Sequence, residues 1–332
     1  LKGPTLKTLL PLIAFLPTFV FAEIEYSGSA AVEQRYFFQD ALYPQQERAN
    51  LSVYFAPQAY TSFNDGNDSI VFIGQPMVAF SLFKDWGNTT VFVLPYFRER
   101  TFSGSDGRFR AELPVDTDNP IFESEDEEKN VDWAIRWQHT LGDWEVGLSY
   151  FDGTSREPDF VFTTNELLEP SLRPFYPQIQ QAGIDVLALL GGWTIKFEGI
   201  QRSVMEQDFS AFVGGFEYSF VGLFDSVYDI NWLMEYQYDG RENLTNVIAQ
   251  NDLMLGTRLV FNDVDGTEIL AGVVQDLDYS NVRYGFVEAS SRINDHWKWR
   301  LDAWLFSSDE PAERSYLLRR DDYIQLSLEY YF

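Results

Sequence analysis

From residue 23 onward, apolar and polar side chains alternate in segments of roughly ten residues, and this alternation most constrains the fold. In 228–239, one side of the segment carries Tyr228, Ile230, Trp232, Met234, Tyr236 and Tyr238, and the other side is mostly polar. Successive side chains of a strand point to opposite faces, whereas a helix would scatter these aromatic residues around its surface. The pattern therefore predicts an all-β chain.

Sixteen segments of this kind are predicted to be strands. They are 23–38, 50–63, 68–74, 77–86, 89–99, 129–140, 143–152, 179–190, 192–202, 209–221, 226–238, 250–262, 265–277, 281–293, 296–307 and 321–332. The hairpin at 68–86 is the least regular, so fourteen strands are the alternative. In 265–293 two alternation patterns, offset by one residue, are both present. The sequence therefore does not decide which side chains of that hairpin face inward.

The connections between these strands are long and short in turn. The long ones include 39–49, 100–128, 153–178, 239–249 and 308–320, and the short ones include 64–66, 87–88, 141–142, 191, 263–264 and 294–295. Long loops on one side and tight turns on the other are typical of membrane β-barrels. A transmembrane antiparallel up-and-down β-barrel of about sixteen strands is therefore predicted, with both ends of the chain on the short-turn side.

The composition agrees with a membrane barrel. Aromatic residues make up 17% of the chain, yet the mean hydropathy is only -0.22. Aromatic girdles outside and polar groups inside produce this combination. No run after Glu23 approaches the roughly 18 apolar residues of a membrane helix.

The first 22 residues have the pattern of a cleavable signal peptide. Lys2 and Lys7 are positive, the stretch 9–21 is apolar, and Val20-Phe21-Ala22 suits a signal peptidase. The apolar stretch is too short for a membrane anchor, which needs roughly 20 residues. We therefore expect a signal peptide in 1–22 and one barrel domain in 23–332.

The last strand alternates fully and ends on an aromatic residue, with Ile324, Leu326, Leu328, Tyr330 and Phe332 on one face. In this the chain resembles the porin-like β-barrel proteins of the Gram-negative outer membrane. The resemblance implies contact with outer-membrane lipid and lipopolysaccharide. It also implies that Leu326, Leu328, Tyr330 and Phe332 form the signal read by the barrel-assembly machinery. It carries over no other functional residue.

A barrel of sixteen strands leaves an aqueous lumen unless something fills it. The leading hypothesis is a channel for passive diffusion of small hydrophilic solutes, narrowed by the loops 100–128 and 153–178. The alternative is a non-conducting structural or binding barrel, or a component of an export assembly. The sequence does not identify the solute, and it leaves the oligomeric state open because lipid-facing strands and subunit interfaces look alike.

If the aromatic faces meet lipid, the opposite faces line the lumen. In the clearer strands those faces hold thirteen acidic and six basic residues, which predicts a cation-preferring pore. The candidates for pore-lining residues are Asp132, Arg136, Glu145, Asp185, Lys196, Glu198, Asp229, Glu235, Asp252, Arg258, Arg300 and Asp302.

The sequence gives little support for disulfides, metal sites, nucleic-acid binding or catalysis. The chain has no cysteine, so neither disulfides nor thiolate metal sites are available, and its net charge of -27 disfavours nucleic acid. His139 and His296 both flank predicted short turns, away from the loops where a barrel enzyme would need them. No enzymatic activity, cofactor or metal is expected. A run of acids in 100–128 could hold divalent cations, but such runs are more often simply solvated. The run consists of Asp116, Asp118, Glu123, Glu125, Asp126, Glu127 and Glu128.

Overall fold

The computed structural model describes residues 25–63, 68–72, 76–164, 168–241, 250–311 and 314–332. The expected signal peptide, 1–22, and the expected turn at 64–66 lie outside the described residues. No helix in the described part of the chain is long and apolar enough to cross a membrane.

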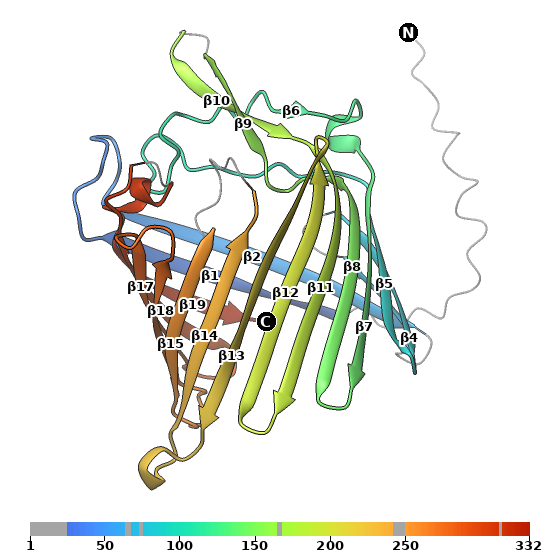
Figure 1. Ribbon diagram of the computed structural model, residues 1–332, viewed down its shortest axis with the longest axis vertical. Coiled ribbons are helices and arrows are strands. Elements are labelled where there is room, and N and C mark those ends of the chain that lie inside the picture. Colours follow the sequence, from blue (N-terminus) through green and yellow to red (C-terminus); the bar gives the residue numbers. More distant parts are fainter. Residues whose placement is uncertain (1–24, 64–67, 73–75, 165–167, 242–249, 312–313) are drawn as a thin grey trace.

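Sixteen strands of the described residues form one closed antiparallel barrel (Figure 1). They are β1 (Glu25–Phe37), β2 (Ala49–Phe63), β3 (Asp68–Phe72), β4 (Val78–Lys84), β5 (Gly87–Leu94), β7 (Asp132–Leu141), β8 (Trp144–Thr154), β11 (Gln178–Leu190), β12 (Trp193–Val204), β13 (Gln207–Phe220), β14 (Asp229–Asp239), β15 (Asn251–Val260), β16 (Glu268–Asp276), β17 (Arg283–Arg292), β18 (Trp297–Ser307) and β19 (Tyr323–Tyr331). Each corresponds to one predicted strand, including the hairpin that left fourteen as the alternative. The predicted barrel is confirmed.

The barrel closes through its first and last strands. β1 and β19 pair antiparallel from Ser29 opposite Tyr331 to Phe37 opposite Tyr323, and Phe332 exchanges backbone hydrogen bonds with Gly28 at 3.0 and 3.1 Å. Closure removes both sheet edges, so the backbone donors and acceptors of these strands are paired within the sheet.

The connections follow the predicted long and short pattern with exceptions. Met205 and Glu206 make a two-residue turn on the long-loop side, both with positive φ. On the opposite side, the β13–β14 connection is longer than a tight turn and contains the 3-10 helix η2 (Leu223–Asp225). Alternation of polarity locates strand ends only approximately, because residues just beyond a strand can continue its pattern.

The two long connections predicted as loops contain a second sheet, which the sequence pattern did not predict. Its order is β6 (Ile121–Phe122), β10 (Pro170–Tyr176) and β9 (Asp159–Thr164), and it lies above one end of the barrel (Figure 1). β6 pairs in parallel with β10, although almost 50 residues separate them in sequence. The remaining 3-10 helices are η1 (Glu127–Lys129) and η3 (Arg314–Leu318).

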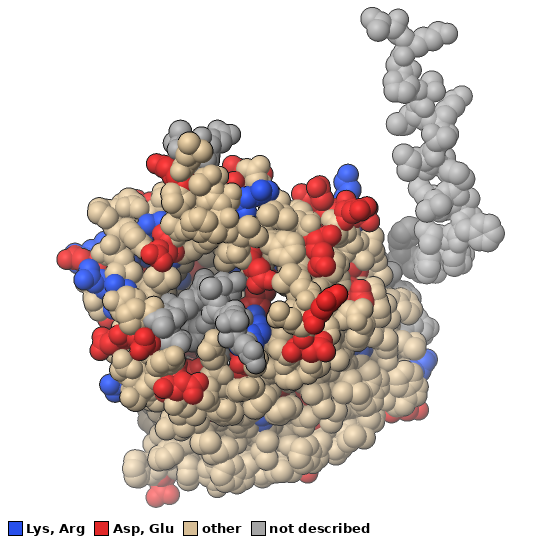
Figure 2. Space-filling view, turned by 45° about the horizontal axis from the view of Figure 1, so that its top comes forward, with Lys and Arg blue, Asp and Glu red and all other residues tan. Residues whose placement is uncertain are grey.

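The two faces of the barrel strands differ as the alternation requires. In β14, Trp232 is 62% exposed on the outer face, whereas its neighbour Leu233 is 7% exposed on the inner face. Figure 2 shows that the outer wall turned toward the viewer is almost free of charged side chains, which gather instead around the opening. The outer surface is therefore apolar and the charges lie at the mouth and inside.

Part of the inner face is nevertheless apolar. Leu233, Met254 and Phe286 are buried in contact with Leu270, Val274 and Trp304, all on the inward positions of β14 to β18. Gly272 makes room for this cluster, because a Cβ atom there would lie 2.7 Å from the Phe286 ring. The inner wall of β14–β18 is thus partly filled by its own side chains.

Candidate pore and its mouth

The connection between β5 and β7, residues 95–131, crosses the mouth of the barrel (Figure 1). Near its start, the buried Phe97 packs against Tyr176, the last residue of β10, with ring centroids 4.8 Å apart. In its middle, Phe109 contacts the inward rings of Phe37 and Tyr323 at 5.4 and 5.5 Å. Five strands, β5, β4, β3, β2 and β1, separate β7 from β19 in the shorter direction round the barrel. The segment therefore bridges distant parts of the wall.

A buried ion pair fastens the middle of this segment. Arg108 and Asp321 are each 3% exposed, and Nε of Arg108 donates to Oδ1 of Asp321 over 2.6 Å. The guanidinium also donates to the carbonyl oxygens of Gln39 and Arg320 and lies 4.5 Å from the Phe37 ring. Burial raises the pKa of Asp321, and Arg108 opposes that rise. The arginine thus holds three parts of the rim together: the segment itself, the β1–β2 loop and the β18–β19 loop.

The far end of the same segment is fastened by Asp132. This residue is fully buried, accepts hydrogen bonds from Asn130 at 2.8 Å and from the backbone of Thr154 at 2.9 Å, and pairs with Arg156 at 2.8 Å. Asp132 is one of the pore-lining candidates that the sequence predicts. The structure places it beneath the loops, where it joins β7 to the β8–β9 connection.

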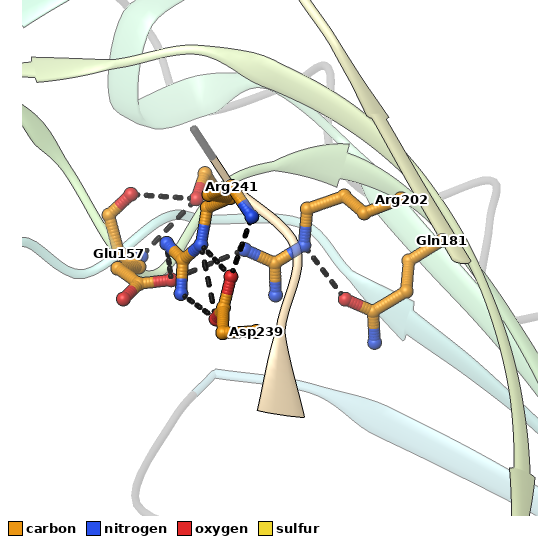
Figure 3. A network of polar contacts seen from close by, with 6 residues as sticks. Glu157, Gln181, Arg202, Asp239 and Arg241 are labelled. Atoms are coloured by element: carbon orange, nitrogen blue, oxygen red, sulfur yellow. Dashed lines mark hydrogen bonds and ion pairs between the residues drawn. The ribbon is translucent and has the colours of Figure 1, made fainter. Parts of the chain in front are cut away.

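The second long connection is tied to the wall by Glu157 (Figure 3). One of its carboxylate oxygens lies 3.2 Å from Arg202 of β12 and 3.1 Å from Arg241, which follows β14. Arg241 also pairs with Asp239 at 2.6 Å, and Arg202 donates to Gln181 of β11 at 2.8 Å. Both connections expected to narrow the lumen are thus held across or against the mouth by charged contacts.

Below the mouth, Arg136 and Asp185 form a bidentate pair on the inner wall. Two nitrogens of Arg136 on β7 reach the two oxygens of Asp185 on β11 at 2.6 and 2.8 Å, across the intervening strand β8. The pair fits because Gly147 lies beneath it: a Cβ atom there would lie 2.3 Å from the carboxylate. Glu198 on β12 lines the same hollow as this pair, and Glu145 lies two residues before Gly147 on the same face of β8. The structure therefore brings four of the candidate residues together.

The other candidates form separate groups around the wall. Lys196 and Arg258 both approach Glu217, at 3.6 and 4.0 Å, and Arg300 pairs with Glu329 at 2.9 Å. Glu198 and Glu235 line one hollow with Asp239. Asp229 caps the β13–β14 connection, accepting from Gly222 and Asn262 at 2.8 Å, and Asp252 is fully buried.

A hollow of about 330 Å³ on the inner wall joins Arg258, Arg300 and Asp302 with two acids that the candidate set lacked, Glu268 and Glu288. These acids lie on β16 and β17, in the stretch where two alternation phases compete. The register resolves the ambiguity, since Glu288 stands opposite Asp302 on the neighbouring strand.

The inner wall keeps a surplus of acid after pairing. Of the six bases expected on inward faces, four form ion pairs with Asp185, Glu217 or Glu329: Arg136, Lys196, Arg258 and Arg300. Within the described residues, no ion pair of 4.0 Å or shorter joins Glu145, Glu198 or Glu235 to a base. Nor do three His, Asp or Glu side chains of the described part converge in a geometry that could hold a metal ion.

Solved porin structures have the same fold as this chain. A porin refined at 1.8 Å resolution matches with 14% identity and a TM-score of 0.53, and two engineered variants of the Rh. blastica porin match with 12% and 11% identity and TM-scores of 0.55 and 0.56. In each case the match covers 93% of this chain and 100% of the other. No protein-family model and no curated protein sequence matches the chain. At this identity the likeness establishes the porin fold.

Proposed function

We propose that the protein is an outer-membrane channel for the passive diffusion of small hydrophilic solutes. The observation that carries this proposal is a closed barrel of sixteen described strands whose outer face is apolar and whose inner face carries ion pairs and unpaired carboxylates. A barrel of this size encloses more space than its side chains fill. The apolar outer face suits lipid, in which only closed barrels and helices satisfy their backbone groups.

The proposed location is the outer membrane of a Gram-negative cell, in contact with lipid and lipopolysaccharide. Export would use residues 1–22 as a leader. Assembly would use the final strand, whose Leu326, Leu328 and Phe332 are exposed on the outer face. Deleting Phe332 should reduce the amount of folded protein in outer membranes far more than its synthesis, measured by immunoblot of cell fractions. Unchanged abundance of the folded truncated protein would contradict an assembly role.

The proposed selectivity is a preference for cations. Its support is the surplus of acids around the lumen, of which Glu145, Glu198 and Glu235 form no ion pair within the described residues. Fixed carboxylates lining a pore attract cations and repel anions. No catalytic role is proposed.

The alternative is a sealed barrel that serves as a structural or docking component. It is favoured by the segment 95–131 across the mouth and by the apolar cluster around Phe286 inside the wall. Conductance of the purified protein in planar bilayers separates the two functions. Stepwise conductance with a reversal potential of cation-selective sign in a salt gradient is expected, and a barrel that inserts but never conducts would exclude the channel.

A further inference from the structure

A cavity of about 390 Å³ lies at the mouth of the barrel, among parts of three connections. Residues 100–103 and 109–111 of the β5–β7 connection form one side, Glu157, Pro158 and Phe160 a second, and Leu317 and Leu318 of η3 a third. The volume falls within the range of roughly 300–1,000 Å³ that is usual for small-molecule sites. None of these residues belongs to the candidate pore-lining set.

Three rings and two leucines give the cavity an apolar wall. Phe102 and Phe160 meet edge to face with centroids 5.4 Å apart. Phe109 is packed on its other side against Phe37, at 5.4 Å, and follows directly after the buried Arg108. The wall is therefore supported by the same contacts that fasten the segment across the mouth, which favours a preformed site.

Two arginines line the cavity without a counter-charge of their own. In the described part of the chain, no ion pair of 4.0 Å or shorter includes Arg100 or Arg110. Nε of Arg110 is buried with no hydrogen-bond partner among the described residues, and its guanidinium lies 4.0 Å from the Tyr43 ring. The Arg110 side chain as a whole is half-buried and lines the cavity, so its more accessible part can meet a ligand there.

The acid in the lining, Glu157, does not neutralise this pair of arginines. Its carboxylate is held by Arg202 and Arg241, outside the cavity lining. The cavity is thus a positive site in a chain whose net charge is -27. The surrounding negative charge disfavours ligands with several negative charges.

We propose that this cavity binds a small organic monoanion, a carboxylate attached to an aromatic or other apolar body. The guanidinium fork matches the geometry of a carboxylate, and the rings of Phe102, Phe109 and Phe160 match an apolar body. The site goes beyond the proposed diffusion function and does not depend on it, since a sealed barrel could hold the same ligand at its mouth.

Calorimetric titration of the folded, full-length protein in detergent micelles tests the proposal, with naphthalene-2-carboxylate as the probe. We expect saturable binding to one site. Naphthalene-2-methanol, which has the same ring system and no charge, should bind at least about tenfold more weakly, because it gives no charge-assisted hydrogen bond. Inorganic phosphate should not compete. Equal binding of the alcohol and the carboxylate would overturn the proposal, since the rings alone would then account for binding.

Variants then assign the binding to the two arginines. Arg110→Gln and Arg100→Gln should each weaken naphthalene-2-carboxylate about tenfold. Lys129→Gln is the matched control: it removes one positive charge from an exposed position on the same connection, outside the cavity, and should leave affinity unchanged.

Should Arg110→Gln fail to fold, Arg100→Gln decides the test, because Arg100 is exposed. Unchanged affinity in folded Arg100→Gln, or equal loss in Lys129→Gln, would overturn the proposal. Bilayer conductance is measured separately, so loss of binding and loss of channel function are distinguishable.

Discussion

Two parts of the barrel wall use the same alternating strands to build different interiors. On β7 to β12, inward positions carry charged pairs such as Arg136 and Asp185, which remain about one third exposed. On β14 to β18, inward positions also carry Leu233, Met254, Phe286 and Trp304, which pack on one another beside the charged hollow. Alternation requires only that the outer face be apolar, since lipid contacts that face alone.

This difference explains where the segment 95–131, which crosses the mouth of the barrel, is anchored. Phe109 and the neighbouring Arg108 rest on inward rings that continue the apolar wall, among them Phe37, Tyr323 and Phe306. These rings exclude water from the ion pair between Arg108 and Asp321. The pair between Arg136 and Asp185 on the other wall remains accessible to water in the lumen. The apolar cluster of β14–β18 therefore supports the constriction, while both walls contribute charged side chains to the lumen.

The largest expected effect comes from breaking that anchor. Arg108→Ala should cost about 3–5 kcal/mol, because it leaves Asp321 buried without its partner. Urea unfolding in lipid vesicles measures the loss, and limited proteolysis should cut the segment 95–131 sooner. Arg48→Ala is the control: its pair with Asp40 is exposed at 3.2 Å, and an exposed pair contributes about 0–1 kcal/mol. The double variant Arg108→Met/Asp321→Asn should recover part of the stability, and equal loss in it would contradict the buried-charge explanation.

The apolar wall is tested directly by Phe286→Ala. Removal of this buried ring should cost about 3 kcal/mol, since it leaves a cavity between Leu233, Met254 and Trp304. The same unfolding measurement reports the loss. A change below about 1 kcal/mol would mean that the inner face of β14–β18 is solvated like the opposite wall.

Adjacent residues of β14 separate the outer face from the inner one. Met234→Arg should cost about 2–4 kcal/mol, because Met234 lies on the apolar outer face and the charge would enter lipid. Glu235→Arg, one residue further and inward, should leave folding nearly intact and reduce cation selectivity. Reversal potentials in a salt gradient measure the second effect, and identical values for wild type and Glu235→Arg would remove the acidic-lumen argument.

The smallest expected effect on stability belongs to the polar wall. Asp185→Asn breaks the pair with Arg136, yet it should change the free energy of unfolding by at most about 1 kcal/mol, because both side chains remain partly solvated. The released positive charge should instead lower cation selectivity, read from the same reversal potentials. A loss as large as that of Phe286→Ala would contradict the contrast between the two walls.

The strands and their two faces could be predicted from the sequence because they depend on local periodicity. Trp232 and Met234 fall on the opposite side from Glu235 whatever the rest of the chain does, since successive strand residues point in opposite directions. The tight turns and the final alternating strand follow from the same local signals. All sixteen barrel strands were found in this way.

The roles of the loops and of the inner wall depend on contacts between distant parts of the chain. β6 and β10 pair across almost 50 residues, Arg108 meets Asp321 across more than 200, and Asp132 is buried under connections that no local pattern places over it. Glu268 and Glu288 join the lumen through a register that competing phases obscured. Periodicity orients a side chain relative to its own strand. Which groups then meet depends on closure of the barrel and on contacts far apart in the chain, and neither leaves a local trace in the sequence.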